Sequence, residues 1–499
     1  MTITLATAQD QNTVRIYVEL QNNGTQDSLE FLFWDNIIKE NTQNPPPHIV
    51  SPSPEKGHFF DGSNGYLKYT ATHNPSEEFI RFTIKLNGQP ILNNYILEAG
   101  SGLRVRINTK ELSLAFGGSA STLAETQYQL SNLFNNRTFN NPPLMVSASP
   151  EKLITNPKFS EVYASAKKDS SDLNLMMRFL YSPQSNRKYL DHLLQVDPLK
   201  DPAFRILESA RENIGDHAAS IFKADIYARL LPPIIDQFSR TFPTLEQTPD
   251  TYIQKILPLL HIPLDDLYAY SPLFVESVLE ISKLKASLYG TKFFDTLDSL
   301  PSALRDRAYA RFILDNFSVM ENPKPYFDRA IAGMNTPWIR DLITEVMDPR
   351  LPGKELPDIQ LFDSDLNPVP LSSFEGKKVM ATFWITGCKF CIMFKNQVLD
   401  QLYSEWKDRD DIILLSINSD KDPLTWQKSL DSGQYVPNGM VSLWAGSETG
   451  NIAEELSIQS FPYKMLLDEN RKILLPAIQS SNPEMIRRKI KEYLSEYIP

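Results

Sequence analysis

Both cysteines of this 499-residue chain lie in one stretch, Thr382-Phe-Trp-Ile-Thr-Gly-Cys-Lys-Phe-Cys-Ile-Met-Phe394. The apolar residues 379–384 that lead into the pair are typical of a buried strand, and residues 390–406 are expected to form a helix. The sequence therefore predicts a strand-to-helix junction, with Cys388 at the N-terminus of the helix.

Further elements alternate along the chain on the C-terminal side of this junction. The expected strands and helices are strands at 379–384, 411–418, 463–468 and 472–475, and helices at 390–406, 423–432 and 483–497. Alternating segments of this length indicate an α/β sheet that is covered by helices. The stretch Asp348-Pro-Arg-Leu-Pro-Gly-Lys354 is rich in turn-forming residues and marks the preceding boundary.

The N-terminal part of the chain has a strand pattern. Residues 14–20 and 79–86 alternate apolar and polar side chains, and Asn87-Gly88 is a strong hairpin signal. Prolines within 44–54 cannot donate to a central ladder, so this part is expected to be a loop or an edge. An antiparallel β domain is therefore predicted.

From about Ser121 the apolar spacing becomes helical. The segments that show it are 123–133, 173–180, 221–231 and 304–314. Prolines separate these segments, and no fixed repeat period appears. The predicted fold class is therefore multidomain, with an antiparallel β domain at 1–118, an all-α region at 119–347 and an α/β domain at 348–499.

Composition excludes some classes of function. The formal net charge is −11 and no cluster of Lys and Arg appears, which argues against nucleic-acid partners. No run of about 18 apolar residues occurs, so no transmembrane segment is expected. The N-terminal Ala6-Thr-Ala8 resembles the small-residue pattern before a signal cleavage site. An incomplete export signal and an ordinary chain terminus both stay open.

The position of the cysteine pair predicts redox chemistry. Unpaired N–H groups and the helix dipole stabilise a thiolate at Cys388, and the charge of Lys389 adds to this effect. In such C-x-x-C sites the thiol pKa falls from about 8.5 to roughly 3.5–7.5. Cys391 follows almost one turn later, close enough to close a ring. We expect Cys388 to be the nucleophile and Cys391 the resolving thiol in thiol–disulfide exchange.

The cysteine pair allows three other interpretations. Half of a zinc site is disfavoured because all six histidines lie upstream of the α/β segment. A purely structural disulfide closes too small a loop to stabilise the fold much, and a pair of inert buried thiols is less expected at a strand-to-helix junction. We expect no metal and no cofactor. A chain whose only thiols are the working pair also cannot mispair internally, which suits an oxidising compartment.

These residues resemble a known family. Phe383-Trp384, Cys388-Lys-Phe-Cys391 and Phe461-Pro462 together look like a thioredoxin fold, and Leu356-Pro-Asp-Ile-Gln-Leu361 with Leu371-Ser-Ser-Phe-Glu-Gly-Lys-Lys378 resembles the envelope-facing, TlpA-like branch. The resemblance covers about 350–499. It implies that Pro462 is a cis-proline facing the cysteines and that the backbone of Phe461 pairs with an extended segment of the substrate.

The resemblance also implies a biological setting. Trp384, Lys389 and Phe390 are expected to contribute to substrate binding, together with Phe461 and Pro462. The implied partners are protein disulfides or dithiols and an upstream electron donor. The implied location is the periplasm or cell envelope. A second resemblance concerns 95–106 and 116–120, which are similar to an N-terminal β module found before thioredoxin domains in some exported proteins.

The chain departs from the family pattern near the cysteines. Thr382 stands where thioredoxins carry a buried acid, and Gly387 replaces a common Trp. The proton acceptor for Cys391 is therefore open, with Glu375 and Asp420 as candidates from sequence order. The leading hypothesis is a thiol-disulfide oxidoreductase. The alternatives are an envelope binding or scaffolding protein with a structural thioredoxin-like domain, and a thiol peroxidase.

Overall fold

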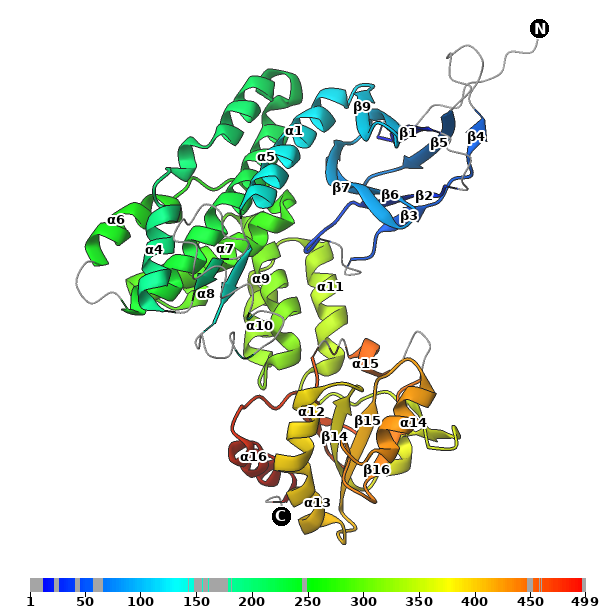
Figure 1. The fold of residues 1–499 in the computed structure, drawn as a ribbon. Helices are drawn as coiled ribbons and strands as arrows, with labels where there is room; N and C mark the ends of the chain where they lie inside the picture. Colours follow the sequence, from blue (N-terminus) through cyan, green and yellow to red (C-terminus); the bar gives the residue numbers. More distant parts are fainter. Residues whose placement is uncertain are drawn as a thin grey trace. The chain divides into compact units, whose positions relative to one another are not determined.

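The computed structural model describes residues 12–21, 27–40, 45–56, 66–141, 143–147, 155, 160, 178–180, 182–244, 249–446, 452–456, 458 and 460–495. The chain divides into two compact units, Met1–Arg311 and Phe312–Pro499. Figure 1 shows their elements. The finer division into domains at 1–118, 119–347 and 348–499 stays a prediction. In the described part of the chain, no helix has both the length and the apolar character needed to cross a membrane.

The first unit begins with two sheets. Their strands are β1 (Val14–Gln21), β2 (Leu29–Trp34), β3 (His48–Val50), β4 (Glu55–Lys56), β5 (Tyr66–His73), β6 (Phe79–Leu86), β7 (Gln89–Glu98), β8 (Gly102–Asn108) and β9 (Ser113–Gly117). One sheet has the order β4-β5-β1-β8-β9 and the other β3-β2-β6-β7. All pairs are antiparallel except β1 with β8, which run parallel. The predicted β domain is therefore present.

Strand alternation explains why the two sheets pack on each other. Ile16 of β1, Phe31 of β2, Phe82 of β6 and Val105 of β8 all belong to one buried apolar cluster between the sheets. The predicted hairpin joins β6 to β7 at Asn87-Gly88, where both residues have positive φ, 51° and 79°. This conformation explains the Asn-Gly sequence, because few other residues adopt it without strain.

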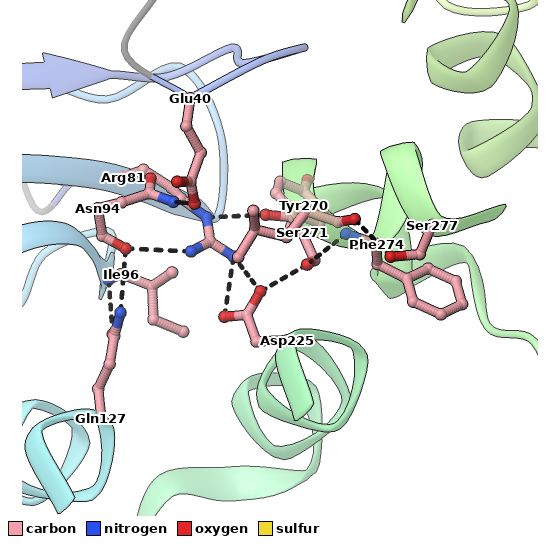
Figure 2. A network of polar contacts seen from close by, with 11 residues as sticks. Glu40, Arg81, Asn94, Ile96, Gln127, Asp225, Tyr270, Ser271, Phe274 and Ser277 are labelled. Carbon is pink, nitrogen blue, oxygen red and sulfur yellow. Dashed lines mark hydrogen bonds and ion pairs between the residues drawn. The ribbon is translucent and has the colours of Figure 1, made fainter. Parts of the chain in front are cut away.

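The second face of β6 carries a buried polar network. Arg81 is 4% exposed, and its guanidinium donates to the carboxylate of Asp225 at 3.1 Å and to the carbonyl oxygens of Tyr270 and Asn94. Figure 2 shows these contacts, together with Gln127, which bonds to the edge of β7. Because Asp225 and Tyr270 lie in the helical part, the network ties the β sheet to the helices of the first unit.

The helices of the first unit pack beside this network. They are α1 (Ser121–Asn140), α4 (Pro183–Leu193), α5 (Pro202–Thr241), α6 (Pro249–Leu260), α7 (Pro272–Tyr289), α8 (Phe293–Asp298) and α9 (Ser302–Asn316), the last of which includes the boundary between the units. A short parallel pair, β10 (Leu144–Val146) and β11 (Arg178–Leu180), lies among them. The helix predicted at 173–180 is therefore wrong for Arg178–Leu180, where pairing with β10 replaces helical bonding; 173–177 lie outside the described residues.

The second unit contains the predicted α/β sheet. After α10 (Lys324–Gly333) and α11 (Pro337–Met347), its strands are β12 (Gln360–Phe362), β13 (Pro368–Pro370), β14 (Lys378–Trp384), β15 (Ile412–Asn418), β16 (Val441–Trp444), β17 (Tyr463–Leu467) and β18 (Ile473–Leu475). The sheet order is β13-β12-β16-β15-β14-β17-β18. The short strands β12, β13 and β16 were not predicted, because each offers too few residues for a clear pattern.

Helices cover both faces of this sheet. They are α12 (Lys389–Phe394), which continues through a π turn at Lys395–Leu399 into α13 (Asp400–Trp406), then α14 (Pro423–Asp431), α15 (Ile452–Glu455) and α16 (Pro483–Ser495). Along β14, Met380 and Trp384 face a core shared with α12, α13 and α16, whereas Val379, Ala381 and Phe383 face a second core on the opposite side. The multidomain fold class is confirmed.

Candidate redox site

The two cysteines form a disulfide at the start of α12. Their sulfurs are 2.12 Å apart and their Cα atoms 5.3 Å apart. Cys388 is the N-cap residue of the helix, and its sulfur accepts a hydrogen bond from the backbone N–H of Cys391 at 3.1 Å. The predicted junction is therefore present, with Cys388 at the helix N-terminus. An N–H that already points at this sulfur also stabilises a thiolate there.

The two sulfurs differ in their access to solvent. Cys388 is half-buried, whereas Cys391 is only 3% exposed and lies in the apolar core under α12. Between them, Lys389 is exposed and Phe390 is 69% exposed. A partner approaching from solvent therefore meets Cys388 first.

The segment before β17 faces the disulfide. The carbonyl oxygen of Phe461 lies 3.7 Å from the sulfur of Cys388, and the peptide bond between Phe461 and Pro462 is cis, the form that the resemblance implies. β17 runs antiparallel to β14, so the start of β17 lies beside the end of β14, where the cysteine loop begins. Both Phe461 and Pro462 are half-buried. The structure thus brings Cys388, Phe461 and Pro462 together.

Two side chains hold the loop before Cys388: Tyr435, which the sequence did not point to, and Asp420, which the sequence offered only as a candidate proton acceptor. The backbone N–H of Gly387 donates to the hydroxyl oxygen of Tyr435 at 2.8 Å, and the backbone N–H of Thr386 donates to Asp420 at 3.1 Å. Gly387 has a φ of 82°, which favours glycine at this turn. Neither contact has a local sequence signal, because Tyr435 follows α14 and Asp420 follows β15.

Trp384 lies beneath the site and not on its surface. The side chain is buried, its ring stacks on that of Tyr435 at a centroid distance of 4.6 Å, and its indole N–H donates to the hydroxyl of Ser416 at 2.7 Å. The indole therefore supports Tyr435, which in turn holds Gly387. Of the five residues expected to contact substrate, four surround the disulfide and Trp384 packs below them.

The candidate proton acceptors from sequence order have other partners. Glu375 precedes β14, at the end of the strand opposite the cysteines, and pairs with Arg471 at 2.9 Å. Asp420 lies at the cysteine end of the sheet, and its carboxylate accepts from Thr386 and from the side-chain amide of Asn418. Asp420 is therefore near the loop, whereas Glu375 is not.

Thr382 stands at the position where the resemblance implies a buried acid. Thr382 is buried, and its hydroxyl oxygen has no hydrogen-bond partner. Directly opposite on β17 stands Lys464, which is also buried. Burial lowers the pKa of Lys464 to about 8, against an opposing effect of the negative charge of Glu321. Among the described residues, no group of three or more metal-ligating side chains occurs.

Comparison with known proteins defines the class of this domain. Residues 351–492 match the Redoxin family model. A thiol-disulfide oxidoreductase ResA of Bacillus thuringiensis is 25% identical over 147 residues, which are 30% of this chain and 79% of that relative. A Haemophilus influenzae protein is 29% identical over 122 residues, 23% of this chain and 72% of the relative. The C-terminal part of the chain is therefore a thioredoxin-fold domain related to thiol-disulfide oxidoreductases, as the resemblance indicated.

Two solved structures from Bacteroides are also similar to part of this chain. The thioredoxin domain of a thiol-disulfide oxidoreductase from Bacteroides vulgatus is 21% identical, with a TM-score of 0.26, and the match covers 29% of this chain and 98% of that one. A thiol:disulfide interchange protein from Bacteroides sp. is 23% identical, with a TM-score of 0.25, and the match covers 30% of this chain and 92% of that one.

Proposed function

We propose that this chain is a thiol-disulfide oxidoreductase that exchanges disulfides with protein partners through Cys388 and Cys391. The observation that carries the proposal is the position of the Cys388 sulfur. It caps α12, accepts the N–H of Cys391 and faces the carbonyl of Phe461 from a half-buried position. A sulfur so placed is both stabilised as an anion and reachable by a partner.

The reaction proceeds in two exchanges. In the reduced protein the thiolate of Cys388 attacks a partner disulfide, and one partner sulfur leaves as a thiolate. The mixed disulfide that results is then attacked by Cys391, which forms the internal disulfide and releases the second partner sulfur. The 5.3 Å between the Cα atoms lies within the usual range for a disulfide, so this second exchange requires no large backbone movement.

The proposed partner surface surrounds Cys388. Phe390 presents an exposed aromatic ring and Lys389 a positive charge beside the sulfur. The backbone at Phe461 pairs with an extended segment of the partner, and Pro462 holds that backbone in place. Trp384 acts from below, because its ring packs against Tyr435 instead of facing solvent.

The proposed setting is the periplasm or cell envelope. Protein disulfides persist in oxidising compartments, and a chain with only two cysteines has no further thiols to mispair there. An upstream donor would keep the pair reduced. The periplasmic location is tested by fractionating cells that produce the chain from its own locus; recovery only with cytoplasmic markers argues against it.

The catalytic proposal is tested with single-cysteine variants. The unaltered protein should accelerate the reduction of insulin disulfides by dithiothreitol. Cys388→Ser should abolish this acceleration and leave only the slow reaction of dithiothreitol alone. Cys391→Ser should instead trap mixed disulfides, seen as a mass increase that a reductant reverses. If Cys388→Ser keeps the activity of the unaltered protein, the assignment fails.

A further inference from the structure

Lys464 occupies an unusual place in the second unit. Its side chain is 7% exposed, and the residue lies on β17, two positions after Pro462. In the described part of the chain we find no hydrogen bond or salt bridge to its ammonium group. Lysine is almost never this buried without a hydrogen-bonded or ionic partner, because removal of its charge from water is costly. A buried lysine on the strand that follows the cis-proline therefore points to a function beyond packing.

Strand alternation places Lys464 on the same side of the sheet as Cys391. Leu466, two residues along β17, belongs to the apolar core that contains Cys391 and Phe394 of α12. The nitrogen of Lys464 lies 5.4 Å from the centroid of the Phe394 ring. Phe394 follows Cys391 by three residues, so the two side chains are neighbours on one helix face. Lys464 therefore reaches the core beside Phe394, the last residue of α12 and three positions after Cys391.

Thr382 completes this arrangement from β14. It pairs with Lys464 across the two strands and lies between Met380 and Trp384, which face the same core. Its hydroxyl oxygen is buried without a partner. The resemblance implies a carboxylate at position 382, but Thr382 has no titratable group. Lys464, on the opposite strand, has one.

The other charges that act on Lys464 are few. Glu321, on the segment that follows α9, raises the pKa of Lys464, whereas burial, the larger effect, lowers it to about 8. The carboxylate of Glu321 is also paired with Lys489 of α16 and accepts the backbone N–H of Gln479. From α12, the titratable group in the core that Lys464 adjoins is Cys391. The carboxylate of Glu321 is therefore already engaged by Lys489, whereas the thiol of Cys391 lies in that apolar core.

We propose that Lys464 is the proton-exchanging partner of Cys391, in place of the buried acid that this chain lacks at Thr382. The proposal rests on the proposed function and adds the residue that activates the second thiol. The amine reaches the thiol directly or through one water molecule.

In the mixed disulfide the thiol of Cys391 gives its proton to the neutral amine of Lys464, which becomes an ammonium. The thiolate of Cys391 attacks the sulfur of Cys388, the bond from Cys388 to the partner breaks, and the partner leaves as a thiolate that is protonated by solvent. In the reverse direction the ammonium returns its proton to Cys391 as that sulfur leaves.

The test uses the full chain and a small disulfide as the partner. Reduced protein is mixed rapidly with dithionitrobenzoate, and thionitrobenzoate release is followed at 412 nm. The first release reports attack by Cys388, and the second reports attack by Cys391. Lys464→Met and Lys464→Gln are compared with Lys472→Met, an exposed lysine of the same unit. Circular dichroism verifies that each variant is folded.

We expect both Lys464 variants to slow the second release at least tenfold at pH 7, with the first release and the Lys472→Met protein within twofold of the unaltered chain. In a Cys388→Ser background, where Cys391 is the one thiol of the sequence, thiolate absorbance at 240 nm should show a higher pKa for Cys391 once Lys464 is replaced. The proposal is overturned if the rate of the second release in the folded Lys464 variants stays within twofold of that of the unaltered chain and the pKa of Cys391 does not change. Absence of the first release in the unaltered protein would instead contradict the proposed function.

Discussion

The backbone N–H of Cys391 donates to the sulfur of Cys388 at 3.1 Å, so the residue that we propose as the resolving thiol also stabilises the sulfur that we propose as the nucleophile. Because that N–H belongs to the first turn of α12, this part of the stabilisation comes from the helix itself. The same geometry leaves Cys388 half-buried and Cys391 in the core.

This difference predicts unequal reactivity. In the reduced protein, Cys388 should react with iodoacetamide at pH 7 about ten times faster than Cys391 or more, because it is more exposed and better stabilised as a thiolate. The rates are measured by mass spectrometry on Cys388→Ser and Cys391→Ser proteins, each of which keeps one thiol. Faster labelling of Cys391 would contradict the assigned roles.

Phe390 should matter for partners and not for stability. Its ring is 69% exposed, so Phe390→Ala should change the free energy of unfolding by less than about 0.5 kcal/mol. The same change should raise the KM for insulin several-fold, because the partner no longer contacts an exposed ring beside the sulfur of Cys388. Phe139→Ala is the matched control, since that ring is 90% exposed on α1. Equal effects of the two substitutions on KM would argue against a partner surface at Phe390.

The ion pair of Arg81 and Asp225 should hold the first unit together. Asp225→Ala leaves a buried guanidinium without its carboxylate and should destabilise this unit by about 3 kcal/mol, although two carbonyl acceptors remain. Asp236→Ala, on the same helix, breaks an exposed pair with Arg240 and should cost no more than about 0.5 kcal/mol. Urea denaturation followed by circular dichroism compares the two, and similar losses would show that the network in Figure 2 does little for stability.

Lys464 should lower the stability of the second unit at neutral pH. Its pKa in the folded protein, about 8, is below the ordinary value of 10.5, so the unfolded chain binds more protons between these two pH values. Stability should therefore rise as the pH increases from 8 to 10.5. Lys464→Met should remove this rise and stabilise the unit at pH 7 by about 1–3 kcal/mol. Urea denaturation at pH 7 and pH 9.5 measures both effects, and a Met variant less stable than the unaltered chain at pH 7 would refute them.

A destabilising effect of Lys464 would be consistent with the role that we propose for it at Cys391. If Lys464→Met both stabilises the protein and slows the attack of Cys391 on the mixed disulfide, the effect of Lys464 on stability is separate from its effect on the exchange. The exposed Lys472 serves again as the control, because its replacement should change neither quantity.

Much of the second unit could be predicted because its signals are local. The apolar run of β14, the helix that follows and the Cys-x-x-Cys spacing lie within one continuous segment, and an N-cap involves residues only a few positions apart. The hairpin at Asn87-Gly88 is local in the same sense. The short strands β12, β13 and β16 escaped prediction because each is stabilised mainly by its neighbours in the sheet.

The sequence by itself determined the position of Cys388 at a helix N-terminus and the class of chemistry that such a pair performs, since both depend on neighbours along the chain. Only the tertiary structure brought the Phe461 carbonyl to Cys388, set Tyr435 against Gly387 and placed Lys464 opposite Thr382. These contacts follow from the order in which distant strands pair, and pairing is decided by the burial of whole sheet faces, which no short stretch of residues encodes.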